Sequence, residues 1–479
     1  MFEARLLIDG KLRGAAHEAT FERVSPTSGK PATRAARASV EDARAAVASA
    51  HAAFPAWSRL SPTARRDHLV AAARALRERT QEFVARVCAE TGGTPGWAHF
   101  NVHLAALMLE EAAALTTQVT GEVRPSSHTG TLALAVRAPA GVVLGMAPWN
   151  APVILGVRAI ATPLACGNTV VLKASELCPA THALIGEVLR ESGMPSGVVN
   201  VVTHAAEDAP AIVEALIAEP AVRRVNFTGS TRVGRIIGAL AGRYLKPVVL
   251  ELGGKAPLVV LDDANLDEAV DAAIFGAFMH QGQICMSTER IVVDEKVADD
   301  FVARLRERAS ALKVGPDAPL GAVIDLETVN RLRALIDDAL SRGATLVCGG
   351  TGEGVYFKPT VVDHVTTAMR LYHEESFGPI VGITRVAGDE AAIQAANDTE
   401  YGLVAAVFTR DLTRALAVAQ RIDAGMCHIN SATVQDEPQM PFGGTKASGV
   451  GRFGGSAGVH EFTELRWLSI ATEPRHYPI

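Results

Sequence analysis

The alternation of short apolar runs with amphipathic segments along the chain predicts an α/β fold. From about residue 142, the apolar runs VVLGMA, TVVLKA and GVVNVV predict strands, and the segments APVILGVRAIATPLA and THALIGEVLRESG between them have helical periodicity. The same strand–helix–strand pattern is predicted again further along, with strands near 257–261 and 290–293 around a helix at 266–279. A second stretch rich in predicted strands and helices covers 320–430. Strands that alternate with helices of this length are typical of a parallel, doubly wound sheet.

The two ends of the chain have patterns of their own. Residues 39–92 are rich in alanine and arginine at amphipathic spacing, which predicts packed helices. Ser39 with Asp42 resembles a capping box, and Ser61 stands before Pro62 as an N-cap stands before a proline at the first helical position. The last residues, HEFTELRWLSIATEPRHYPI, are aromatic and β-prone and predict a terminal strand that packs on a neighbour.

Composition narrows the class of protein. The 479 residues, 48% of them hydrophobic, suit a large α/β protein of more than one domain. The net charge of −6, without a basic block, argues against a nucleic-acid partner. The chain start lacks the apolar stretch of a signal peptide, and the most apolar region, 131–149, is interrupted by Arg137, so we expect a soluble cytoplasmic protein. The six cysteines show neither a CxxC pair nor zinc spacing, so we expect no disulfide framework and no metal site.

One cysteine stands in an unusual context. Cys285 follows a Gln-Gly-Gln turn signal in GAFMHQGQICMSTERI and precedes Ser287 and Thr288. A core cysteine usually lies inside an apolar run, whereas a reactive thiol needs access and a backbone that lets other groups come close. The segment alone leaves both interpretations open.

Two motifs at predicted strand ends could bind a nucleotide. Gly229 and Ser230 in VNFTGSTRVGR lie between a strand and a helix, where free backbone N–H groups and the helix dipole favour phosphate. Lys173 and Glu176 in VVLKASE lie just past another strand, where an acid can bind a ribose diol. Taken alone, a plain strand–helix turn and a solvated Lys–Glu pair explain these motifs equally well.

Further polar residues have the character of a catalytic site. Glu251 in LELGGKAP is enclosed by leucines, and burial there would raise its pKa and suit it to general-base chemistry; a strand-end carboxylate satisfied by local amides has the same pattern. Asn150 in APWNAP could cap the following helix or donate to a developing oxyanion. The segment ESFGPI at 375–380 is a turn with an acid and an aromatic residue.

The motifs PWN, KxSE, FTGS, ELGG, GQxC, ExFGP and PFGG, in this order, resemble those of the aldehyde dehydrogenase superfamily. The resemblance covers nearly the whole chain, from LLIDGKL to EFTELRW, and the separation of Glu251 from Cys285 is the usual one of the family. Within the superfamily, GAFMHQGQICMSTERI and VRAIATPLACGN are most similar to salicylaldehyde dehydrogenases and to the neighbouring vanillin- and benzaldehyde-type enzymes.

The resemblance implies the aldehyde dehydrogenase fold in three parts. These are a Rossmann-like NAD-binding domain (1–118 and 142–250), a catalytic α/β domain (251–454) and a small bridging sheet (119–141 and 455–479). Unpaired edges of short bridging strands call for a partner, so a homodimer or a dimer of dimers is expected.

The resemblance also implies a reaction, the NAD-dependent oxidation of an aromatic, salicylaldehyde-like aldehyde to its acid. Cys285 would be the nucleophile that forms a thiohemiacetal and then a thioester, Asn150 and the Cys285 N–H would hold the oxyanion, and Glu251 would activate water. Lys173 and Glu176 would bind the adenosine ribose and Ser230 the pyrophosphate. The full set of expected cofactor-binding residues is Pro148, Trp149, Lys173, Ser175, Glu176, Phe227, Gly229, Ser230, Val233, Leu252, Gly253, Glu375 and Phe377.

The expected substrate pocket departs from many relatives. Ala151 and Arg158 stand where aromatic residues are common, which suggests a wide apolar pocket with one cation. Arg158 either holds a polar ring substituent or pairs with a neighbouring acid and shapes the wall, and Trp97 either closes the far side or only packs. The residues expected to line this pocket are Trp97, Ala151, Leu155, Arg158, Met279, Ile284, Met286 and Phe442.

Two other functions compete with this one. A CoA-acylating semialdehyde dehydrogenase would pass the acyl group to CoA, but members of that class commonly lack the carboxylate at Glu251. A catalytically idle binding or structural protein would have no physical need to keep Cys285, Asn150 and Glu251 together. His280, five residues before Cys285, is given no catalytic role, because the family's base is the glutamate.

Overall fold

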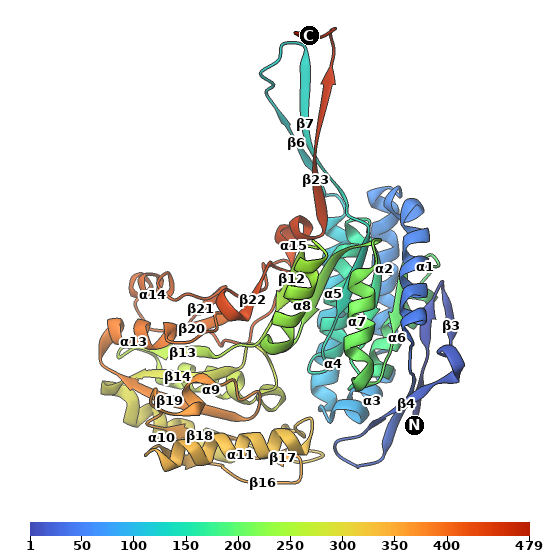
Figure 1. The fold of residues 1–479 in the computed structure, drawn as a ribbon. Coiled ribbons are helices and arrows are strands. Elements are labelled where there is room, and N and C mark those ends of the chain that lie inside the picture. The colour runs from blue at the N-terminus through green and yellow to red at the C-terminus, as the bar shows by residue number, and fades with distance from the viewer.

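The computed structural model describes residues 1–479 and contains two large sheets with helices on both faces (Figure 1). In the first sheet the central strands, β12 to β10, are parallel, and antiparallel strands close both edges. Its strands are, in spatial order, β22 (Gly449–Val450), β12 (Val248–Glu251), β11 (Val222–Thr228), β8 (Val142–Met146), β9 (Thr169–Lys173), β10 (Val199–Val202), β2 (Leu6–Ile8) and β3 (Lys11–Arg13).

Two groups of helices cover this first sheet, and each buries its own apolar core. On one face lie α1 (Val40–Ser58), α7 (Ala209–Ala218) and α8 (Thr231–Arg243). On the other lie α5 (Pro152–Ala165) and α6 (Pro179–Glu191), backed by α2 (Pro62–Glu78), α3 (Thr80–Thr91) and α4 (Pro95–Leu115). The capping box of α1 and the serine cap of α2 are confirmed: the Ser39 Oγ accepts from the Asp42 N–H at 3.1 Å, and the Ser61 Oγ accepts from the Ala64 N–H at 3.2 Å.

The second sheet is parallel except for β15 at one edge. Its order is β15 (Thr345–Cys348), β18 (Thr360–Asp363), β19 (Ile380–Val386), β14 (Thr288–Asp294), β13 (Ala256–Val260), β20 (Val404–Phe408) and β21 (Met426–Ile429). Helices α9 (Leu266–Phe278) and α10 (Glu295–Ala311) pack on one face, and α13 (Gly388–Asn397) and α14 (Leu412–Ala419) pack on the other. Two further helices, α11 (Leu326–Ser341) and α12 (Arg370–His373), and the hairpin of β16 (Gly352–Glu353) and β17 (Tyr356–Phe357) complete this unit.

A three-stranded antiparallel arm projects from the body of the molecule, as Figure 1 shows. It consists of β6 (Gly121–Arg124), β7 (Thr131–Pro139) and β23 (Thr463–Ala471), so a small sheet does form from the two predicted segments. The second segment starts differently, because α15 (Gly455–Glu461) forms a helix that packs on α4 and α5 before the strand begins. No helix in the molecule combines the length and apolarity needed to cross a membrane.

Candidate active site

The chain between the two sheets places Glu251 and Cys285 near one another. Glu251 is the last residue of β12 in the first sheet, and β13 of the second sheet begins at Ala256. Cys285 lies between the turn η3 (Met279–Gly282) and β14, at the amino end of the second sheet. A Cβ on Gly254 would lie 2.5 Å from the backbone oxygen of Cys285, so this glycine permits the close approach of the two segments.

A strained turn presents the thiol. His280 and Gln281 both have positive φ, 49° and 56°, and Gly282 follows at 68°. A side chain on Gly282 would collide with the backbone oxygen of Gly378, at 2.2 Å from its Cβ. Strained backbone of this kind persists where the surrounding structure fixes it, and it is common at functional sites. Cys285 is half-buried, as are Cys88, Cys348 and Cys427, so the strained turn beside it, rather than its exposure, favours the reactive interpretation of this cysteine.

Glu251 is buried without a hydrogen-bond partner. Its exposure is 0%, and neither carboxylate oxygen has a partner. Burial raises the pKa of Glu251 to about 8, with the neighbouring Cys285 as the largest opposing influence. The predicted rise is confirmed, and the alternative of a carboxylate satisfied by local amides is excluded. Burial, and then the charge of Glu251, likewise raises the pKa of the Cys285 thiol well above its ordinary value.

Glu90 shows what a structural buried glutamate looks like in the same chain. It is equally buried, yet its carboxylate accepts hydrogen bonds from the Thr33 hydroxyl, from the Thr181 hydroxyl and from the N–H groups of Ala180 and Thr181, at 2.6–2.9 Å. Leaving a buried acceptor unpaired costs about 1–3 kcal/mol. The Glu251 carboxylate is unpaired in this way and lies beside the Cys285 thiol. An unpaired carboxylate is free to accept a proton, as a catalytic base must be.

Asn150 is tied to the nucleophile turn. Its Nδ2 donates to the backbone oxygen of Gln283 at 2.8 Å, and its own backbone oxygen accepts from the Trp97 indole at 2.9 Å. Helix α5 begins after Ala151 without a side-chain cap, so the alternative that Asn150 caps this helix is wrong. An amide NH₂ has two donor hydrogens, and the second remains for an oxyanion.

A buried ion pair fixes the loop that carries Glu375 and Phe377. Lys255 and Glu289 are joined at 2.7 Å with almost no exposure. Glu289 also accepts from the Ser376 N–H at 3.0 Å, the Ser376 hydroxyl at 2.9 Å and the Phe377 N–H at 2.9 Å. Glu289 lies near the start of β14, shortly after Cys285. Its hydrogen bonds therefore attach this loop to the segment that carries Cys285. The pair was not predicted from the sequence, although the charged residues Lys255 in ELGGK and Glu289 in STERI were a signal for it.

The loop that carries Glu375 and Phe377 faces residues 252–255, the linker between the two sheets. The Gly254 N–H donates to the Glu375 carboxylate at 2.9 Å, and a Cβ on Gly253 would lie 2.7 Å from that carboxylate. Burial raises the pKa of Glu375 to about 7. Phe377, at a positive φ of 44°, places its ring edge-on to Trp149, with 5.9 Å between the ring centres. The loop of the second sheet therefore meets Trp149 of the first sheet near the linker.

The remaining expected cofactor residues share one edge of the first sheet. They lie at or just after the carboxyl ends of the parallel neighbours β8, β9, β11 and β12: Pro148, Trp149, Lys173, Ser175, Glu176, Phe227, Gly229, Ser230, Val233, Leu252 and Gly253. Ligands of open α/β sheets bind at this edge. Lys173 is half-buried, and desolvation lowers the pKa of its ammonium, with the nearby Glu176 as the largest opposing influence; the two side chains form no direct ion pair.

The expectation that the Gly229 N–H is free to bind a phosphate is wrong. The Gly229 N–H is not a free donor, because it donates to the Glu251 backbone oxygen at 3.0 Å. The Ser230 Oγ caps α8 by accepting from the Val233 N–H at 3.4 Å. The amides available to a phosphate therefore begin at Ser230 and continue on the first turn of α8, where the helix dipole favours an anion.

The apolar residues expected to line the substrate pocket belong to one large core of 53 buried residues: Trp97, Ala151, Leu155, Ile284, Met286 and Phe442 are members of it, and Met279 and Cys285 pack against it. Trp97 stacks on His280 with ring centres 4.5 Å apart, and it donates to Asn150, so it supports the site. Neither ring nitrogen of the buried His280 has a partner, and desolvation lowers its pKa to about 3.

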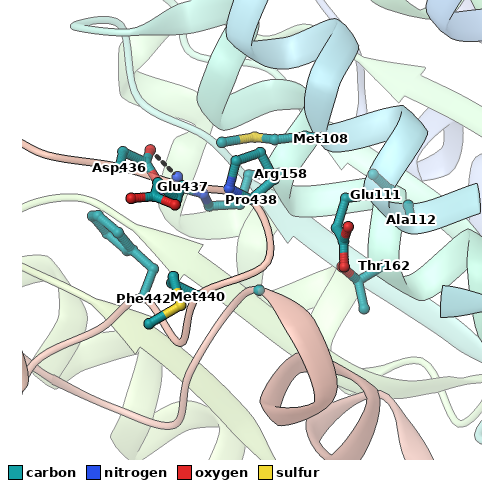
Figure 2. A pocket seen from close by; sticks show the side chains of 12 residues that line it. Met108, Glu111, Ala112, Arg158, Thr162, Asp436, Glu437, Pro438, Met440 and Phe442 are labelled. Atoms are coloured by element: carbon teal, nitrogen blue, oxygen red, sulfur yellow. Dashed lines mark hydrogen bonds and ion pairs between the residues drawn. The ribbon is translucent and has the colours of Figure 1, made fainter. Parts of the chain in front are cut away.

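Arg158 does pair with an acid. Its guanidinium forms an ion pair with Asp436 and lies over the Phe442 ring, 4.1 Å from the ring centre (Figure 2). The second of the two roles considered for Arg158, pairing with a neighbouring acid, is therefore the arrangement observed. Asp436 lies 278 residues further along the chain, and its position was not predicted from the sequence.

The chain belongs to the aldehyde dehydrogenase family, whose model matches residues 13–468. It is therefore an oxidoreductase that acts on aldehydes, and the family uses a nicotinamide cofactor. The chain is 59% identical to a vanillin dehydrogenase of Pseudomonas sp. strain HR199 over the full length of both. It is 46% identical to a salicylaldehyde dehydrogenase of Pseudomonas putida, over 99% of this chain and 100% of that one. The crystal structure of a salicylaldehyde dehydrogenase from Pseudomonas putida G7, complexed with salicylaldehyde, superposes with a TM-score of 0.98 at 46% identity and full coverage of both chains.

Proposed function

We propose that the protein is an NAD-dependent dehydrogenase that oxidises an aromatic aldehyde to the carboxylic acid. The observation that carries the proposal is the buried Glu251 carboxyl, unpartnered and of raised pKa, beside the half-buried thiol of Cys285. The apolar core against which Cys285 packs suits an aromatic ring. The names of the relatives, vanillin, salicylaldehyde and benzaldehyde dehydrogenases, support the same substrate class.

In the proposed first half-reaction, Glu251 in its carboxylate form takes the proton of the Cys285 thiol. The sulfur then forms a bond to the aldehyde carbon, and the carbonyl oxygen becomes an oxyanion. The second N–H of the Asn150 amide and the backbone N–H of Cys285 hold that oxyanion. The nicotinamide, when bound, supplies the acceptor for the hydride that leaves the tetrahedral carbon. Loss of the hydride leaves a thioester on Cys285.

In the second half-reaction, Glu251 serves again as the base. After it has lost its proton to solvent, it takes a proton from a water molecule, whose oxygen attacks the thioester carbon. The carbon–sulfur bond breaks, the acid departs, and the thiolate recovers a proton. A single carboxyl thus accepts protons from two different donors, which requires that it stay free of fixed hydrogen bonds.

The residues present fit a dinucleotide. The first turn of α8, with Ser230 as its cap, would hold the pyrophosphate, and Lys173 and Glu176 would hold the adenosine ribose. Glu375 and Phe377 would face the nicotinamide, held in place by Glu289. We accordingly propose that 1–118 and 142–250 form the NAD-binding domain and that 251–454 form the catalytic domain.

The arm supplies a surface for a second copy. Its residues Leu465 and Trp467 are 63% and 78% exposed, although both are large and apolar. Large exposed apolar side chains on a short sheet mark an interaction surface, and the unpaired edges of such a sheet favour a partner. We propose that the segments 119–141 and 455–479 join two copies of this chain into a dimer, or a pair of dimers.

A direct assay tests the proposed activity. The protein mixed with NAD and benzaldehyde, without CoA, should produce reduced nicotinamide and benzoate. Turnover only in the presence of CoA would instead identify a CoA-acylating enzyme. The absence of any turnover with aromatic and aliphatic aldehydes would leave an idle protein on the same fold.

The cofactor preference should depend on Glu176. A carboxylate that accepts from the ribose 2′-OH repels a 2′-phosphate, so kcat/KM should favour NAD over NADP by about tenfold or more. Glu176→Gln should narrow this ratio. Glu207→Gln, at an exposed acid after the neighbouring strand β10, serves as the control and should leave the ratio as it is. Equal kcat/KM values for the two cofactors in the native protein would refute the assignment.

The pH dependence should follow Glu251. Because burial raises its pKa to about 8, the carboxyl is mostly protonated at neutral pH and cannot accept a proton. The rate of thioester hydrolysis should therefore increase with pH and level off above about 8. Stopped-flow measurement of the single-turnover rate across the pH range checks this. A flat profile through neutral pH would contradict the role of Glu251 as base.

A further inference from the structure

A fully buried histidine, His182, joins two segments of the candidate site. It lies near the start of α6 and is 0% exposed. Its Nδ1 accepts a hydrogen bond of 3.0 Å from the backbone N–H of Ser175, in the loop that carries Glu176. Its Nε2 lies 3.1 Å from the backbone oxygen of Pro152, shortly after Asn150. One imidazole therefore connects the expected cofactor loop to the segment expected to hold the oxyanion.

The two partners fix the form of the His182 ring. A backbone N–H can only donate, so the Nδ1 that accepts from Ser175 carries no proton. A carbonyl oxygen can only accept, so the Nε2 that donates to Pro152 carries one. The ring is thus neutral, in a single tautomer, with both nitrogens used. Burial, and then the charge of Lys173, lowers the pKa of His182 to about 3, so this form persists at neutral pH.

Helix α6 contacts the segment of Asn150 on both sides of that residue. The Cys178 thiol, at the start of α6, lies 4.0 Å from the backbone oxygen of Pro148, and the His182 Nε2 donates to the backbone oxygen of Pro152. These two contacts bracket Asn150 in the sequence. The position of the Asn150 amide therefore depends on where α6 and its histidine lie.

The other two buried histidines make no such connection. Neither ring nitrogen of His280 has a partner. The Nδ1 of His204 donates only to the backbone oxygen of the next residue, Ala205, at 2.7 Å, and its Nε2 has no partner. Only His182 uses both nitrogens, and it uses them on two separate segments.

We propose that His182 is a positioning residue for both ends of the site. Through Pro152 it holds the Asn150 amide in the orientation that suits an oxyanion. Through Ser175 it holds the loop of Glu176 in the form that binds the ribose. The inference rests on the proposed function, which supplies these roles of Asn150 and Glu176. One end uses the ring as an acceptor and the other uses it as a donor, so each can be removed without the other.

Two substitutions of His182 separate the two contacts. The amide oxygen of asparagine is bonded to Cγ, as Nδ1 is, so His182→Asn keeps an acceptor for Ser175 and loses the donor to Pro152. The amide nitrogen of glutamine is one atom further along, as Nε2 is, so His182→Gln keeps the donor and loses the acceptor. Each variant is therefore the matched control for the other.

The two variants should change different quantities. His182→Asn should lower kcat at saturating NAD about ten- to a hundredfold, because the oxyanion-stabilising amide is misplaced, and should leave the Kd for NAD within about twofold of the native value. His182→Gln should raise the Kd for NAD about three- to tenfold, as expected for one lost hydrogen bond, and should leave kcat within about threefold. Titration calorimetry measures the Kd, and nicotinamide absorbance measures kcat.

A double variant shows whether His182 acts through Asn150. In Asn150→Ala the amide to be positioned is gone, so the addition of His182→Asn should lower kcat no further. A side chain that only stabilised the fold would lower kcat by the same factor in both backgrounds. His204→Asn is the control at a buried histidine that joins no second segment, and it should leave kcat at saturating NAD close to the native value.

Gly156→Ala tests the Pro152 contact with His182 still in place, should His182→Asn fail to fold. A Cβ on Gly156 would lie 3.3 Å from the Cδ2 and 3.6 Å from the Nε2 of His182, so it crowds the donating edge of the ring. Alanine suits a helix interior, so Gly156→Ala should fold. It should lower kcat several-fold, on the order of the loss in His182→Asn or less, and leave the Kd for NAD unchanged.

Equal changes of kcat and of the Kd in His182→Asn and His182→Gln overturn the inference, and so does an unchanged kcat in both His182→Asn and Gly156→Ala. A double variant with Asn150→Ala that loses as much again also overturns it and limits His182 to a role in folding. A native protein that binds NAD but oxidises no aldehyde overturns the proposed function instead. The Kd values of the two His182 variants then still decide the inference at Ser175.

Discussion

Cys285→Ala should abolish aldehyde oxidation, with kcat lower by on the order of 10⁴-fold or more, because no other group in the site can form the thioester. Folding and cofactor binding should survive. The thiol is half-buried and makes no hydrogen bond that holds the fold, so the loss of one sulfur atom should change the free energy of unfolding by about 1 kcal/mol or less. The absorbance of reduced nicotinamide measures turnover. Thermal unfolding without NAD measures folding stability, and the shift in the unfolding temperature on addition of NAD measures cofactor binding.

Cys348→Ala is the matched control for this variant. Cys348 is also half-buried, but it lies on β15 at the edge of the second sheet. Its replacement should leave kcat close to the native value. Substantial turnover in Cys285→Ala would transfer the nucleophile role to another residue and remove the chemical basis of the proposed function.

Glu251→Gln should separate the two halves of the reaction. An amide cannot accept the proton of water, so thioester hydrolysis should slow by about 10²–10⁴-fold. Hydride transfer should slow less, because the variant also removes the carboxylate charge that raises the pKa of the Cys285 thiol, and the thiol can lose its proton to solvent instead. Rapid mixing should then show a burst of one reduced nicotinamide per active subunit before a slow steady state.

Glu90→Gln provides the comparison, because Glu90, like Glu251, is 0% exposed, and all its bonds are structural. Glu90→Gln should lower the free energy of unfolding, but it should not produce a burst of reduced nicotinamide. If Glu251→Gln slowed hydride transfer and hydrolysis to the same extent, its role would be limited to shaping the site or activating the thiol.

The sequence pattern predicted the elements that pack as regular α/β units. The runs that became β8, β9, β10 and α5 were recognisable because each is mostly apolar and almost wholly buried. The N-terminal sheet of β1 (Phe2–Ala4), β5 (Pro31–Ala36) and β4 (Thr20–Val24) was not predicted. Its strands are short and alternate with exposed polar residues, so their pattern is weak until the sheet around them forms.

The candidate site was predictable where a motif carries its chemistry locally. Cys285, Glu251 and Asn150 stand in such motifs, and the structure brings all three to the junction of the two sheets. Contacts between distant segments were not predictable. Asp436 reaches Arg158 across 278 residues, and nothing near Asp436 in the sequence marks it as buried. The Gly229 N–H was expected to be free because the sequence does not show that β12 lies beside it.

The central claim is a thioester on Cys285 whose hydrolysis needs Glu251, and intact-protein and peptide mass spectrometry of Glu251→Gln tests it most directly. After brief mixing with NAD and benzaldehyde and an acid quench, the peptide that contains Cys285 should carry one benzoyl group, and hydroxylamine should remove it. Native protein treated in the same way should carry little, because Glu251 releases the acid. Nicotinamide reduction without any benzoyl group on Cys285, or with that group on a different residue, would contradict the account.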